Sequence, residues 1–95
     1  MAAYLVIQTL SITDPDTYDQ YRAQARPLIE AAGGEYLLVG KTVHPYSGDW
    51  SPLRVVMIRF KDVATLKACF DSPAYRAIAP LRKASVVGQS VIVED

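Results

Sequence analysis

Two arginines are the residues of this chain best suited to bind a ligand. Arg54 shares its strand parity with a set of apolar residues, Val56, Ile58 and Phe60, so the base of its side chain is predicted to lie on a buried face. Arg82 shares a helical stripe with Tyr75 and Ile78. A guanidinium that is buried without a partner is costly, so each arginine needs a carboxylate, a phosphate or a bound anion. Two interpretations stay open. Each arginine anchors an acidic ligand, or it forms a structural ion pair with Asp14, Asp49 or Asp71.

The other side chains with useful chemistry are one histidine and several aromatic residues. His44 is the only histidine, the residue type that titrates nearest neutral pH, and is a weak candidate for a general base; its alternative is an ordinary loop residue. Trp50 and Tyr46 bracket a loop and suit either the mouth of a pocket or a subunit interface. Tyr18, Tyr21 and Tyr75 fit core packing, although the hydroxyls of Tyr18 and Tyr21 could also reach a cleft between helix and sheet.

Other kinds of site lack the necessary residues. One histidine and one cysteine, with no HxH, HExxH or CxxC spacing, predict no metal site. The glycines follow neither GxGxxG nor GxxxxGK, so we expect no nucleotide cofactor, and no serine stands in a GxSxG context. Cys69 lies between Ala68 and Phe70 with no activating neighbour, which favours a buried and inert thiol.

Composition narrows the class of protein. The 95 residues suffice for one domain, residues 1–95. Ten basic and ten acidic residues cancel without a cluster of either sign, so we expect no nucleic-acid partner. The apolar runs are too short to span a bilayer, so we expect no membrane partner. The N-terminus lacks the basic region of a signal peptide, so we do not expect secretion by that route. A single cysteine fits a cytoplasmic location.

The helices and strands that would position these residues are predicted from the spacing of apolar residues and from the residues that begin or end a helix. Asp14, Asp62 and Ser72 each precede a predicted helix as N-caps, with Pro15 and Pro73 at the first turn. Pro27 and Pro80 are expected to kink, break or end their helices, and Gly33 to stop the first one. Strands are predicted at four places: Ala3–Leu10, Glu35–Val43, Leu53–Phe60 and Val86–Val93.

The resulting order is βαββαβ with the second helix split in two. This order is typical of the α+β ferredoxin-like fold, a four-stranded antiparallel sheet with helices on one face. The first, third and fourth strands are apolar on both faces, and 51% of the residues are hydrophobic. The face without helices therefore needs a cover, which a homodimer with two sheets face to face supplies.

A set of motifs spread over nearly the whole chain resembles the DUF1330 family. The most specific are Gly48-Asp49-Trp50 followed by Arg54-Val55-Val56, and the box Ser72-Pro73-Ala74-Tyr75; Asp14-Pro15 and Gly33-Gly34 add to them. The resemblance implies a dimeric α/β-barrel, as in the antibiotic-biosynthesis-monooxygenase-like group of small, often cofactor-free proteins, and implies no activity. Arg59 is a departure, because members usually carry a glutamate there.

Two hypotheses for function follow. In the first, a cleft between sheet and helices binds or transforms a small organic acid without a cofactor; it is polarised by Arg54 and Arg82, bordered by Tyr21 and Tyr75, and closed by Trp50. In the second, the protein is a non-catalytic self-associating or ligand-sensing module whose polar residues are structural. The two differ in whether Arg54 and Arg82 face a cavity or carboxylates of the same dimer.

Overall fold

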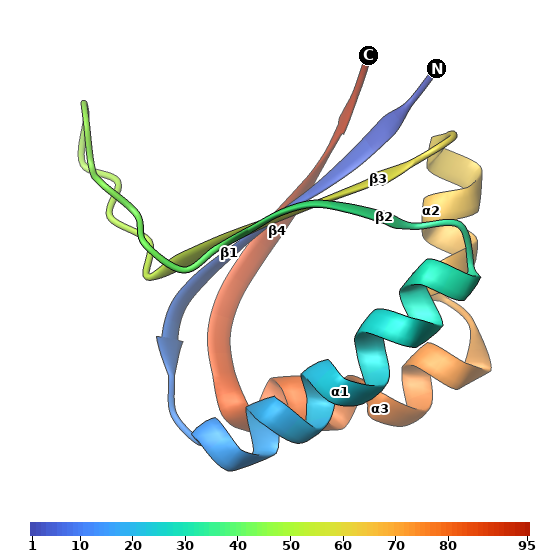
Figure 1. Cartoon of the computed structure of the whole chain (residues 1–95), viewed down its shortest axis with the longest axis horizontal. Coiled ribbons are helices and arrows are strands. Elements are labelled where there is room, and N and C mark those ends of the chain that lie inside the picture. Colours follow the sequence, from blue (N-terminus) through green and yellow to red (C-terminus); the bar gives the residue numbers. More distant parts are fainter.

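The computed structural model describes residues 1–95 and has the predicted ferredoxin-like element order. The sheet is antiparallel, with the strands in the order β2-β3-β1-β4, and all three helices lie on one side of it (Figure 1). The elements are β1 (Ala3–Ile12), α1 (Pro15–Ala31), β2 (Glu35–Gly40), β3 (Arg54–Phe60), α2 (Val63–Phe70), α3 (Pro73–Ser85) and β4 (Val86–Glu94).

Alternate residues of β1 and β3 build the core between sheet and helices. Leu5 of β1 lies opposite Ile58 of β3 and Ile92 of β4, so these three side chains share the helix-covered face. Phe60 and Ile58 are almost completely buried there, together with Ile29 of α1. Because side chains alternate along a strand, Arg54 is on this same face, as its parity with Ile58 predicted.

The predicted helix caps are confirmed at all three positions. The carboxylate of Asp14 accepts hydrogen bonds from the backbone N–H and the hydroxyl of Thr17, and that of Asp62 accepts from the N–H of Thr65. The hydroxyl of Ser72 accepts from the N–H of Tyr75. These caps satisfy N–H groups that have no partner within a helix, and so they fix where each helix begins.

Of the outcomes predicted at the internal prolines, a break or an end of the helix was wrong, and a kink stays a prediction. α1 runs through Pro27 and α3 runs through Pro80 without interruption. Both prolines are exposed, so the ring and the missing hydrogen bond face solvent. Each helix buries residues on both sides of its proline, and burial of that face outweighs the roughly 3 kcal/mol that an internal proline costs. Gly33, with φ +100°, ends α1 as predicted.

The connection between β2 and β3 is longer than predicted. β2 ends at Gly40 instead of Val43, and residues 41–53 form an arm that projects beyond the sheet on the side away from α2 (Figure 1). Proline cannot donate to a strand ladder, and both Pro45 and Pro52 lie in this arm. Strand pairing therefore stops at Gly40 and Val55.

The sheet face opposite the helices carries a row of apolar side chains across all four strands. Leu38 lies beside Met57, Met57 opposite Val6, and Val6 opposite Val91. Leu38 and Val91 are 46% and 59% exposed, values far above those of the core. In a single subunit this face is therefore open to solvent.

Candidate functional site

A cavity of about 120 Å³ lies between α1 and the helix-covered face of the sheet. β1, β2 and β3 form its floor, and side chains of α1 form its roof. Apart from tyrosine hydroxyls, its polar lining consists of Thr9 and four arginines: Arg22, Arg26, Arg54 and Arg82. No carboxylate lines the cavity. Its polar groups are therefore mostly hydrogen-bond donors, and its charge is positive.

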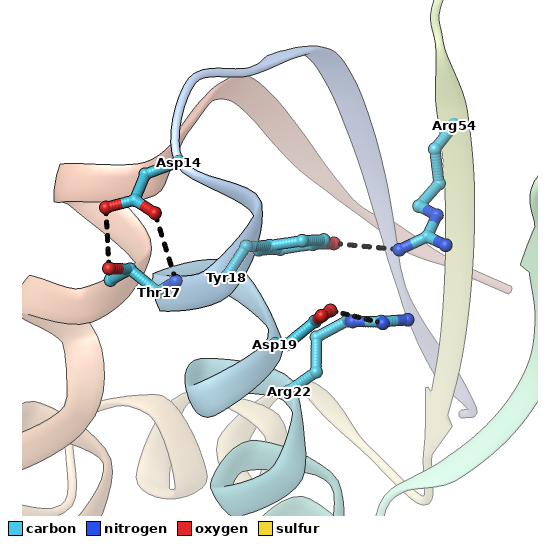
Figure 2. Close-up of polar contacts among 6 residues, drawn as sticks. All are labelled: Asp14, Thr17, Tyr18, Asp19, Arg22 and Arg54. Carbon is cyan, nitrogen blue, oxygen red and sulfur yellow. Dashed lines mark hydrogen bonds and ion pairs between the residues drawn. The ribbon is translucent and has the colours of Figure 1, made fainter.

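Arg54 reaches into this cavity from β3 and meets Tyr18 of α1. Figure 2 shows the tyrosine pointing across the space between helix and strand, and Arg54 Nη1 donates to its hydroxyl oxygen at 3.2 Å. The guanidinium carbon is 5.7 Å from the centroid of the Tyr18 ring. A hydroxyl that accepts from a cation still has its own proton to donate, and polarisation by the cation strengthens that donation.

The two arginines of α1 are partly neutralised by carboxylates of their own helix. Arg22 Nη2 lies 2.8 Å from Asp19 Oδ1 (Figure 2), and Arg26 Nε lies 3.7 Å from Glu30 Oε2. Both pairs are exposed, and solvent-exposed pairs of this kind hold their geometry weakly. Arg22 and Arg26 therefore contribute positive potential at the rim of the cavity.

Arg54 and Arg82 take part in no ion pair. The chain forms two ion pairs, and both belong to α1. Within one subunit, neither arginine therefore pairs with Asp14, Asp49 or Asp71, and an ion pair across the predicted homodimer stays a prediction. Asp14 instead caps α1 through Thr17, which lowers the pKa of its carboxyl, and that carboxylate is directed at Thr17. Two half-buried guanidinium groups thus border one cavity without a counter-charge.

Tyr21 and Tyr75 form a buried pair at the edge of the cavity. Their hydroxyl oxygens are 2.7 Å apart, and their rings meet edge to face with centroids 6.3 Å apart. Burial and the adjacent Tyr75 raise the pKa of Tyr21, so its hydroxyl stays protonated. Only one of the two protons is needed for their mutual hydrogen bond. The other has no acceptor on the protein and is available to a ligand.

Tyr21 also borders a second hollow, which is larger and more open. This groove has a volume of about 520 Å³ and lies between β1 and β4 on one side and α2 and α3 on the other. Tyr75 lines the groove and not the cavity, whereas Tyr21 and Arg82 line both. The sequence-predicted residues Arg54, Arg82, Tyr21 and Tyr75 are therefore brought together at two adjoining hollows.

His44 and Trp50 lie apart from both hollows. Each is exposed in the arm of residues 41–53, and neither lines the cavity or the groove. The expectation that Trp50 closes the cleft of its own subunit is wrong, because the arm extends away from the helices (Figure 1). His44 has no hydrogen-bonded carboxylate to orient it. Cys69 is buried as predicted, and burial raises the pKa of its thiol.

Sequence reasoning did not single out four polar residues of the cavity lining: Thr9, Arg22, Arg26 and Tyr36. Burial raises the pKa of Tyr36 to about 12, and the guanidinium carbon of Arg26 is 4.6 Å from its ring centroid. Arg22 follows Tyr18 by four residues, and Arg26 follows Arg22 by four. Helical spacing therefore places both arginines along the flank of the buried stripe, a signal present in the sequence.

Fold and cavity together define a small α+β protein of the ferredoxin-like class. Residues 2–95 match the family described as Domain of unknown function (DUF1330), and the chain belongs to this family. The resemblance drawn from its motifs is therefore confirmed. Arg59, the departure from that pattern, is exposed opposite Tyr4 and Glu35 on the outer sheet face, away from the cavity.

Solved structures share the fold at low sequence identity. A protein of unknown function from Rhodopseudomonas palustris is 17% identical, with a TM-score of 0.83 over 99% of this chain and 82% of that one. A DABB family protein with a ferredoxin-like fold from Mesorhizobium loti is 12% identical, with a TM-score of 0.72 over 100% and 98%. SnoaB, a cofactor-independent oxygenase from Streptomyces nogalater, is 11% identical, with a TM-score of 0.66 over 99% and 91%. No curated protein has significant sequence similarity to the chain. No helix has the length and apolar character needed to cross a membrane.

Proposed function

We propose that the protein binds a small organic acid as its carboxylate in the cavity between α1 and the sheet. The observation that carries this proposal is the placement of Arg54 and Arg82 on one cavity with no protein carboxylate to neutralise them. A half-buried cation without a counter-charge costs folding free energy, and a bound anion offsets that cost. Arginine also recognises a carboxylate through two parallel hydrogen bonds.

The hydroxyls around the cavity complete a set of donors for such a ligand. Tyr18 accepts a hydrogen bond from Arg54, and its own hydroxyl can donate a hydrogen bond to the ligand. The Tyr21–Tyr75 pair has one hydroxyl proton that their mutual hydrogen bond does not use, and this proton can also be donated to a ligand. Donors fixed around a cavity also stabilise negative charge on a bound acid. The lining contains no carboxylate or histidine that could accept a proton, so the arrangement serves binding of an anion. SnoaB, a cofactor-independent oxygenase, shares the fold, so a cofactor-free reaction of the bound acid is a second candidate function.

The outer sheet face supports a homodimer as the working form. Its row of apolar residues is too exposed to be stable in water by itself, and a second copy presents the same row. Tyr46 and Trp50 of the arm are also exposed, which favours the subunit interface over the pocket mouth for these aromatic residues. The acid-binding cavity lies on the opposite face of the sheet and stays open in such a dimer.

A thermal-shift screen of carboxylic acids tests the proposed binding. The wild-type protein is expected to melt at a higher temperature with at least one acid, because a ligand that binds only the folded state raises Tm. Arg54→Met is expected to lose that rise, whereas the exposed Arg76→Met, a matched control on α3, keeps it. Absence of a response to any acid in a broad screen, or equal responses in both variants, would contradict the proposal.

A further inference from the structure

The cavity and the groove adjoin, because four residues line both. These shared residues are Ile7, Tyr21, Phe70 and Arg82. Of these, Arg82 is the only charged group, and Tyr21 is one of the two hydroxyls that share the spare proton of the tyrosine pair. A ligand bound against these four residues therefore lies in both hollows at once.

The two hollows differ in chemical character. The cavity is bordered by four arginines and no acid. Both hollows are lined mostly by hydrophobic residues, eleven of sixteen in the cavity and eight of twelve in the groove, where they include Leu5, Leu66 and Ile92. Beyond Arg82, the charged residues of the groove are Lys67 and Asp71, which have opposite signs. The four arginines of the cavity thus attract an anion, whereas the groove has a smaller excess of positive charge and offers apolar surface.

The cavity and the groove also differ in the size of the ligand that each can hold. A dry cavity of about 150 Å³ holds one benzene molecule, so the 120 Å³ cavity suits a head group with only a few additional carbons. The groove offers about 520 Å³. Its wall includes the helix-facing side of the edge strand β4, where Ser90 is exposed and Ile92 is 40% exposed. This inner side of β4 is left without cover by the helices.

We infer that the ligand is an amphipathic monocarboxylic acid whose carboxylate lies at Arg54 and Arg82 and whose apolar tail runs past Tyr21 into the groove along β4. This inference rests on the proposed acid binding and adds the chemical class of the acid. The carboxylate matches the positive cavity, and the tail covers Ile92, which is 40% exposed in the groove. A tail of several methylene groups gains affinity from each group that it removes from water.

A chain-length series of linear carboxylates, from acetate to octanoate, tests the inference by calorimetric titration. Each methylene that enters the groove is expected to tighten Kd by about three- to fourfold, so octanoate is expected to bind about two orders of magnitude more tightly than butanoate. Octylamine, with the same tail and the opposite charge, is expected to bind at least tenfold more weakly than octanoate, because its head group meets arginines.

A variant that fills the groove separates the contribution of the tail to the affinity from the contribution of the head group. Ser90 faces the groove from β4 beside Ile7, so Ser90→Trp is expected to abolish the gain with chain length while leaving the affinity for butanoate unchanged. Ala23→Trp, at an exposed position of α1 that lines neither hollow, is the control and keeps the full gain. Tight binding of short acids with no dependence on length in the wild type would overturn the inference and leave the proposed function standing. Failure of every acid to bind would overturn both.

Discussion

Replacement of Arg54 by methionine separates a ligand-binding role from a structural one by its effect on the ligand-free protein. The variant loses one hydrogen bond from a charged donor, worth about 1.5 kcal/mol or more, and a cation–π contact worth about 0.5–1 kcal/mol. It also removes a half-buried charge that has no counter-ion, a gain of similar size, and methionine retains the apolar stem. The net change in the free energy of unfolding is expected to stay within about 1 kcal/mol of zero.

Differential scanning calorimetry with urea unfolding measures this change. For a domain of this size, about 1 kcal/mol corresponds to a shift in Tm of about 4–8 °C, so the Tm of Arg54→Met is expected within that distance of the wild type in either direction. Arg76→Met, an exposed control, is expected to change the stability by less than about 0.5 kcal/mol. A loss of 3–5 kcal/mol, about the cost of breaking a buried ion pair, would refute the reasoning.

Three further predictions concern the proposed dimer, the core and alkaline pH. Met57→Lys places a charge in the apolar row of the outer face and is expected to give folded particles at the 10.5 kDa mass of one chain by light scattering; a mass that stays doubled would exclude that face as the interface. Gly34→Ala is expected to lower the free energy of unfolding by about 1–3 kcal/mol, because the new Cβ would lie 2.6 Å from Ile29 Cγ2. Gly48→Ala is the control: the space around Gly48 is open, so this variant carries only the strain of a φ of +75°. An unchanged Tm in Gly34→Ala would contradict this packing. The pKa of Tyr21 is raised in the folded state, so the unfolded chain releases this proton first and stability is expected to fall as pH rises above about 10; Tyr21→Phe should flatten that dependence, and an equal slope in both proteins would show that the hydroxyl is not shielded.

The order of helices and strands could be predicted because the residues that mark where helices begin act on their near neighbours in the sequence. Asp14, Asp62 and Ser72 cap helices through hydrogen bonds to residues three positions later, and such contacts are present in the sequence itself. The parity of Arg54 within β3 is equally local. The breaks expected at Pro27 and Pro80 failed for the opposite reason. Packing of the buried helix faces against distant strands, which no local rule contains, decided whether those helices continued.

The candidate site could be predicted only in part. Strand parity and helical stripe placed Arg54 and Arg82 toward the interior, but whether they met carboxylates depended on where three aspartates lay in space. Trp50 was assigned to the pocket by its residue type and its place in a loop. Pairing ends at Gly40, three residues earlier than predicted, and the arm of residues 41–53 extends away from the helices.

A crystal structure with bound 6-bromohexanoate tests the central claim most directly, because anomalous scattering locates the bromine independently of the carboxylate. The account predicts carboxylate oxygens at about 3 Å from guanidinium nitrogens of Arg54 or Arg82, with the bromine in the groove beside Ile92. A carboxylate bound elsewhere, with both guanidinium groups still facing an empty cavity, would contradict it.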